Sequence, residues 1–146
     1  MKENTTNPSI VNSPDIYPTL MDMLGLEAMP EQHVDGKSFW PALNKNKPLA
    51  GRTTYWHWPH YSNHGEQSPA GAIRSGPFKL IEYYEHKTRQ LFNLANDPGE
   101  QNNLAAQYPE KADSLSKVFH QWLREVNAPM PGPNPDFRGK NPESHP

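Results

Sequence analysis

The chain has 146 residues, of which 34% are hydrophobic and 17 are proline, and its formal net charge is −2. The length predicts one domain, and the mixed charges exclude a basic face that would bind nucleic acid. The chain has no cysteine, which excludes disulfides, thiolate metal sites and a cysteine nucleophile. No apolar run approaches the roughly 20 residues that span a bilayer, and Met1 is followed by polar residues, so neither a membrane segment nor a secretory signal is expected.

The first third of the chain predicts two short helices. Residues 1–12 show no periodic pattern and are interpreted as a disordered N-terminal segment. Apolar side chains recur at helical spacing over Ser13–Leu24, which starts with a Ser-Pro pair suited to a first turn and ends before Gly25. Asp15 is interpreted as a first-turn carboxylate that the helix dipole alone explains. Residues 39–43 predict a second, shorter helical piece.

The middle of the chain predicts an antiparallel sheet. Residues that favour strands alternate with turn signals. Pro59 ends the first strand, and Gly76-Pro77 joins the second strand to the third as a hairpin. The expected strands are Thr53–Trp58, Ala70–Ser75, Phe78–Tyr84 and Arg89–Leu94.

The last third predicts a long helix and a tail. After an Asp-Pro-Gly turn, Glu100–Ala106 is expected to form one or two helical turns. Glu110–Val126 carries apolar residues three and four apart, with Trp122 central in the stripe, so this helix should cover one face of the sheet. Residues 127–146 hold six prolines and predict a Pro-rich extended tail. The expected fold class is α+β: a four-stranded antiparallel sheet packed against a long C-terminal helix, with an N-terminal helical segment.

The order of four stretches resembles the C-terminal part of the alkaline-phosphatase-like sulfatases, especially bacterial polysaccharide sulfatases. The stretches are SPDIYPTLMDMLG (13–25), VDGKSFWPAL (34–43), YWHWPHY (55–61) with AIRSGPFKL (72–80), and LFNLANDPGEQNNL (91–104). The resemblance implies a sulfatase C-terminal subdomain over residues 13–126, leaning on a large α/β domain that carries the chemistry. It also implies that the parent enzyme hydrolyses sulfate esters of a polysaccharide, uses calcium in its catalytic domain, and works in the periplasm or outside the cell.

The sequence departs from the catalytic pattern of that family. Its nucleophile is a Cys or Ser matured to formylglycine, followed by any residue, Pro, Ser and Arg. Ser75 has a proline two positions later, but the residues that follow are Phe and Lys, and the stretch is typical of a hairpin turn. The chain alone is therefore expected to hold no catalytic residue, metal or cofactor, and to be inactive.

Four residues are candidates for lining the substrate cleft of the parent enzyme: His57, Trp58, His60 and Arg74. Sugar rings stack on aromatic faces, imidazoles hydrogen-bond to hydroxyls or sulfate, and a guanidinium binds oxyanions with two hydrogen bonds. The alternative for the aromatic residues is a packed edge between domains. The alternative for Arg74 and Lys79 is a strand residue that faces solvent or a carboxylate such as Glu82.

Other interpretations stay open. A carbohydrate-binding or interaction module would use the aromatic segment Tyr55–Tyr61 without hydrolysis, and a structural remnant would neither bind nor hydrolyse. His57, His60 and His64 admit a metal site, but no cysteine or well-placed carboxylate completes a ligand set. The expected partners are the catalytic domain of the parent sulfatase, a second copy of the chain and a sulfated polysaccharide, with no nucleic acid and no membrane.

Overall fold

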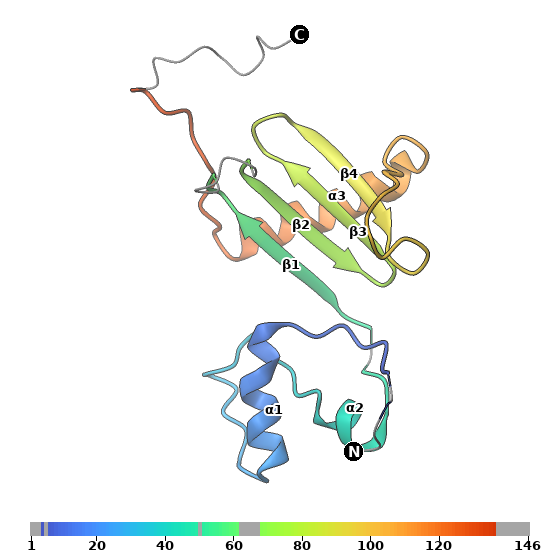
Figure 1. The fold of residues 1–146 in the computed structure, drawn as a ribbon. Coiled ribbons are helices and arrows are strands. Elements are labelled where there is room, and N and C mark those ends of the chain that lie inside the picture. The colour runs from blue at the N-terminus through green and yellow to red at the C-terminus, as the bar shows by residue number, and fades with distance from the viewer. Residues whose placement is uncertain (1–3, 5, 50, 62–67, 137–146) are drawn as a thin grey trace. The chain divides into compact units, whose positions relative to one another are not determined.

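The computed structural model describes residues 4, 6–49, 51–61 and 68–136 (Figure 1). The chain divides into two compact units, Met1–Thr53 and Thr54–Pro146. Among the described residues, no helix is both long enough and apolar enough to cross a membrane.

The first unit contains the two predicted helical segments. A 3-10 turn, η1 (Ser13–Asp15), leads directly into α1 (Ile16–Met23), and α2 (Trp40–Lys45) follows after a long connection. Pro18 is tolerated in the first turn of α1 because the first N–H groups of a helix have no partner within it. The expected N-terminal helical segment is confirmed, with a tighter first turn.

Asp15 is a central residue of the first unit. Its side chain is fully buried. It accepts hydrogen bonds from the Arg52 guanidinium at 2.8 Å and from the backbone N–H groups of Asn12 at 2.7 Å and Lys37 at 2.9 Å. Thr19 donates its hydroxyl to the Asp15 carbonyl. The helix dipole alone was the wrong explanation, because most of these partners come from outside the helix.

Acid should weaken the first unit through Asp15. Burial by itself raises the pKa of this carboxyl, but the hydrogen bonds from Arg52, Asn12 and Lys37 outweigh burial and lower the pKa from 3.8. A carboxyl whose pKa is lower in the folded state stabilises that state at neutral pH, and this contribution is lost as the pH falls below 3.8 and through the folded pKa. We therefore expect the hydrogen-exchange protection factors of α1 to decline in that acidic range. A Glu27→Gln control, which removes an exposed carboxyl, should keep the decline; protection that stays flat down to about pH 2 would contradict the expectation.

The second unit is built on a four-stranded antiparallel sheet. Its strands lie in the order β1 (Thr53–Trp58), β2 (Ala70–Ser75), β3 (Phe78–Tyr83) and β4 (Thr88–Asn93), so every strand pairs with its neighbour in sequence. The β2–β3 register sets Ser75 opposite Phe78, with Gly76 at a φ of +57° in the turn between them. Helix α3 (Pro109–Glu125) follows. The expected α+β fold class is confirmed.

The segment between β4 and α3 differs from the expected helical turns. Residues 100–106 form no helix, and Glu100 has a φ of +55° that a helix does not allow. The Asp97 carboxylate instead accepts the N–H groups of the next residues, 101 and 102. Leu104 then donates its N–H to the Leu91 carbonyl at 2.7 Å, and the Asn103 side chain accepts the Leu91 N–H. The helix was the wrong expectation because these residues bond to the outer edge of β4.

The core lies between α3 and one face of the sheet, and Figure 1 shows α3 running behind the strands. Its buried residues are Ile73, Leu80 and Leu91 of the sheet and Ala112, Leu115, Phe119 and Leu123 of the helix. Phe119 is fully buried, and a Cβ at Gly71 would come within 2.3 Å of its ring, so only glycine fits there. Trp122, expected at the centre of the stripe, lies at its margin and stacks on Tyr55 with ring centroids 4.7 Å apart.

The two faces of the sheet have different surroundings. In β1, Tyr55 stacks on Trp122 of α3, so alternate residues place Trp56 and Trp58 on the opposite face. No helix described within the second unit packs on that opposite face. We call it the open face and define it by Trp56, Trp58, Ala72, Arg74, Lys79 and Ile81.

Candidate functional site

The open face carries a shallow hollow of about 610 Å³. Its apolar part comes from Trp56 and Trp58, whose side chains are exposed by 42% and 52%, and from small or aliphatic residues of β2 and β3. Ala72 has no large side chain, which leaves room between the tryptophans and Ile81. An exposed pair of tryptophans beside such a hollow is suited to a flat apolar partner, either a sugar ring or another protein surface.

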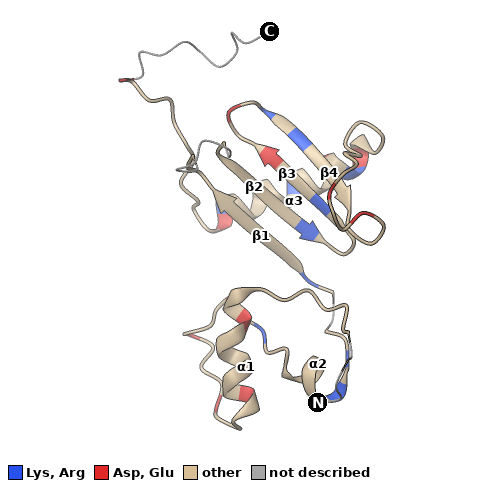
Figure 2. Cartoon of the chain, viewed as in Figure 1, with Lys and Arg blue, Asp and Glu red and all other residues tan. Residues whose placement is uncertain are grey.

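Two cations lie on the open face beside one carboxylate. Arg74 and Lys79 stand opposite each other in the β2–β3 register, and Figure 2 shows basic positions on both strands. The Lys79 ammonium binds both oxygens of Glu100, at 2.7 and 2.9 Å. The Arg74 Nε is buried and has no hydrogen-bond partner within the described residues. The hollow therefore has an excess of one positive charge and an N–H group that still needs an acceptor.

The partner of Lys79 corrects the sequence interpretation. Glu82 was named as a possible partner of Arg74 and Lys79, but it points to the opposite face and binds His120 there, with Nε2 and Oε2 2.7 Å apart. Glu100 was missed because it lies 21 positions from Lys79, on the segment that was expected to be helical. Strand alternation in the sequence could predict that Lys79 lies on the face opposite Leu80, but it could not predict its partner.

His57 is oriented differently from the other three predicted site residues. It borders the same hollow, but its ring nitrogens turn to the α3 side, where Nδ1 lies 2.6 Å from the Tyr84 hydroxyl and Nε2 lies 2.8 Å from the Pro129 carbonyl. Trp58 and Arg74 line the hollow together. His60 follows β1 and meets the Trp58 ring edge-on, at 6.2 Å between centroids. Trp58 and Arg74 therefore share the hollow, His60 contacts Trp58 without lining the hollow, and the imidazole of His57 turns away from it.

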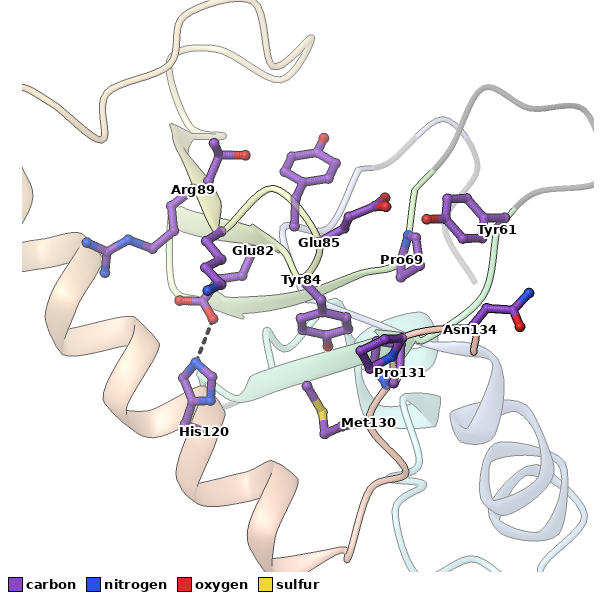
Figure 3. A pocket seen from close by; sticks show the side chains of 15 residues that line it. Tyr61, Pro69, Glu82, Tyr84, Glu85, Arg89, His120, Met130, Pro131 and Asn134 are labelled. Carbon is purple, nitrogen blue, oxygen red and sulfur yellow. Dashed lines mark hydrogen bonds and ion pairs between the residues drawn. The ribbon is translucent and has the colours of Figure 1, made fainter. Parts of the chain in front are cut away.

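A second hollow, of about 1000 Å³, lies beside the turn that joins β3 to β4 (Figure 3). The Glu82–His120 pair forms part of its wall, and Tyr84 and residues 130–134 form another part. Burial, followed by the nearby charge of Glu82, raises the pKa of the Tyr84 hydroxyl, so this group stays protonated at neutral pH. Several polar side chains that line this hollow already have partners: Glu82 binds His120, the Tyr84 hydroxyl bonds to His57, and Arg89 binds Asp113.

Metal ligands are not grouped in the described part of the chain. Residues 4–136, apart from their undescribed positions, contain no group of three His, Asp or Glu side chains placed to hold an ion. His64 of the candidate histidine cluster lies outside the described residues. The calcium ion that the sequence resemblance implies belongs to the catalytic domain of the parent enzyme, and the described residues of this chain offer no ligand set for it.

Comparison of the sequence with known protein families identifies the family of this chain. The family described as "N-sulphoglucosamine sulphohydrolase, C-terminal" matches residues 1–128. This chain is a sulfatase C-terminal domain. The resemblance inferred from its four stretches is confirmed, and the family belongs to the alkaline-phosphatase-like sulfatases.

Curated relatives of this sulfatase C-terminal domain are much longer proteins. A "Sulfatase" of Formosa agariphila is 31% identical over 140 residues, which cover 86% of this chain and 25% of the relative. "Arylsulfatase K" of Mus musculus is 32% identical over 133 residues, covering 86% of this chain and 23% of the relative. An "N-acetylglucosamine-6-O-sulfatase" of Bacteroides thetaiotaomicron is 28% identical and is covered to the same 23%. The sulfatase C-terminal domain described here thus spans about a quarter of the relatives that it matches.

Solved structures share its fold. BT4656, in complex with its substrate D-glucosamine-2-N,6-O-disulfate, is 28% identical, with a TM-score of 0.63 over 79% of this chain and 24% of that one. BT1596, a 2-O GAG sulfatase, is 24% identical with a TM-score of 0.58 over 78% and 25%, which shows the likeness of fold.

Proposed function

We propose that this domain works as part of a sulfatase that hydrolyses sulfate esters of a polysaccharide. In this proposal a separate catalytic domain supplies the nucleophile and the calcium ion, and the open face packs against that domain at the rim of the substrate cleft. The observation that carries the proposal is the open face itself: two exposed tryptophans, and an arginine whose buried Nε has no partner among the described residues.

The composition of the open face favours a protein interface at its centre. Tryptophan and arginine are the residues most enriched among the energetic anchors of interfaces. A buried N–H group without an acceptor costs free energy, so a partner that offers a carboxylate or carbonyl oxygen to Arg74 would remove that cost. The excess positive charge of the Arg74, Lys79 and Glu100 group also favours an acidic partner group.

The end of β1 favours a sugar contact at the edge of that interface. Trp58 is half exposed, and His60 meets its ring edge. An indole face stacks on a sugar ring, and an imidazole donates to hydroxyl or sulfate oxygens. The names of similar proteins refer to sulfated amino sugars: one comparison gives an N-acetylglucosamine-6-O-sulfatase, and another gives an enzyme solved with D-glucosamine-2-N,6-O-disulfate. We therefore assign Trp58 and His60 to binding and orienting a sulfated sugar, and Arg74 to the acidic group of the partner domain or to the sulfate.

A domain exchange tests this function. The chain replaces the matching quarter of the N-acetylglucosamine-6-O-sulfatase of Bacteroides thetaiotaomicron, and hydrolysis of 6-sulfated N-acetylglucosamine is measured for the hybrid and for the chain alone. We expect turnover by the hybrid and none by the chain. Trp58→Ala in the hybrid should raise KM about tenfold with a smaller effect on kcat, because stacking contributes to substrate binding.

Tyr108→Ser is the matched control for the domain exchange. Its side chain is 47% exposed, close to the exposure of Trp58, but it precedes α3 and does not line the open face. The control should leave KM unchanged. A folded, active hybrid in which Trp58→Ala and Arg74→Ala both behave like the control would contradict the proposed role of the open face. Hydrolysis by the repurified chain alone would contradict the need for a catalytic domain.

A further inference from the structure

The chain after α3 turns back toward the end of β1. Asn127 adopts a φ of +49°, and Ala128 donates its N–H to the Leu123 carbonyl at 2.9 Å, which closes the helix end. The next residue, Pro129, places its carbonyl 2.8 Å from His57 Nε2. We call residues 127–134 the strap. The family match ends at residue 128, so nearly all of the strap lies beyond it.

The hydrogen bonds of His57 define its proton positions. The Pro129 carbonyl only accepts, so Nε2 of His57 must carry the hydrogen. In the neutral ring Nδ1 is then an acceptor, and the Tyr84 hydroxyl, 2.6 Å away, must donate to it. Tyr84 remains a donor because burial and then the charge of Glu82 raise its pKa. The result is one directed chain of hydrogen bonds from Tyr84, which follows β3, through His57 of β1 to the strap.

The strap also forms one wall of the larger hollow. Met130, Pro131 and Asn134 line it together with Tyr84 and the Glu82–His120 pair (Figure 3), and Gly132 and Pro133 complete the strap's part of the lining. On the same side, the neighbouring Glu85 carboxylate raises the pKa of the Tyr61 hydroxyl. The end of β1 is thus held to the α3 side at His57.

This arrangement matters because β1 is an edge strand. It pairs with β2 alone in the sheet order, and Pro59 follows its last residue. The ends of edge strands open readily when few contacts hold them. His57 lies between Trp56 and Trp58 in the strand, so holding its ring on the α3 side fixes the two indoles on the open face.

We propose that the strap and the His57–Tyr84 pair form a positioning device that holds the end of β1 in register, so that Trp56 and Trp58 are presented to the partner of the open face. His57 and Tyr84 are positioning residues in this device and touch no substrate. The effect of this device on partner binding rests on the proposed function. Its effect on the stability of β1 does not, and can be measured in the isolated chain.

Hydrogen exchange on the whole chain tests the device. Tyr84→Phe removes only the hydroxyl, and a chain ending at Ala128 removes the Pro129 acceptor. Each should reduce the protection of the β1 amides about fivefold, the effect of one neutral hydrogen bond. The two changes together should give less than the product of the single effects, because both act through the His57 ring. Tyr108→Ser is the control, since this exposed side chain precedes α3 and lies outside β1 and the strap, and it should leave β1 protection unchanged.

Amides of α3 provide the internal reference. Equal loss of protection in β1 and α3 would mean general destabilisation and would overturn the proposal, as would unchanged β1 protection in both variants. Nitrogen NMR gives an independent measurement: at a pH where the His57 ring is neutral, we expect its hydrogen on Nε2, and a hydrogen on Nδ1 would contradict the directed chain. If β1 loosens as expected while Trp58→Ala leaves KM unchanged in the hybrid enzyme, the device stands and the proposed function fails.

Discussion

Phe119→Ala should destabilise the second unit by about 3–5 kcal/mol, the range for removing a large aromatic side chain from a core. Phe119 is fully buried at the middle of the α3 stripe, packs over Gly71, and lies near the ring of Trp122. Replacing it leaves a cavity that the sheet cannot fill, because Ile73, Leu80 and Leu91 are held by their strands. For a unit of this size the melting temperature should fall by about 15 °C or more, measured by circular dichroism.

Val118→Ala is the matched control on the same helix. Val118 precedes Phe119 but is 42% exposed, so its replacement should change the free energy of unfolding by less than about 0.5 kcal/mol. If the two variants melt within a few degrees of each other, the core does not lie between α3 and the sheet as described.

Arg52→Ala should destabilise the first unit by about 3–5 kcal/mol, because it leaves the buried Asp15 carboxylate without its counter-charge. The side chains of the pair are 12% and 0% exposed, and the closest atoms lie 2.8 Å apart. Two backbone N–H groups would still bind the carboxylate, but they carry no full charge. Hydrogen exchange of α1 measures the loss in this unit without interference from the second.

Arg89→Ala is the control for Arg52→Ala, because it breaks an ion pair of similar length that is exposed to solvent. The Arg89–Asp113 pair is as short, at 2.7 Å, but its side chains are 39% and 55% exposed. Solvent screens such a pair, so its loss should cost less than about 1 kcal/mol. A cost for Arg52→Ala no larger than that for Arg89→Ala would show that Asp15 is hydrated in solution rather than buried.

The local pattern of the sequence was sufficient to predict the strands and the long helix and to identify the family. Period-two alternation and the turn at Gly76-Pro77 predicted the β2–β3 hairpin, and spacings of three and four predicted α3, because both depend on neighbours a few positions apart. The sequence also predicts part of the open face, because strand alternation places Trp56 and Trp58 on one face once Tyr55 is placed on the other. The ordered stretches were sufficient to identify a sulfatase C-terminal domain.

Only the tertiary structure decided which side chains meet. Asp15 binds Arg52 across 37 positions, Lys79 binds Glu100 across 21, and His57 binds the Pro129 carbonyl across 72. No local propensity specifies such pairs, because a titratable side chain shows the same sequence pattern whether its partner is water or a distant residue. The same reason explains the missing helix at residues 100–106, where bonds to Leu91 of β4 outweigh the weak preference of a polar segment for helical turns.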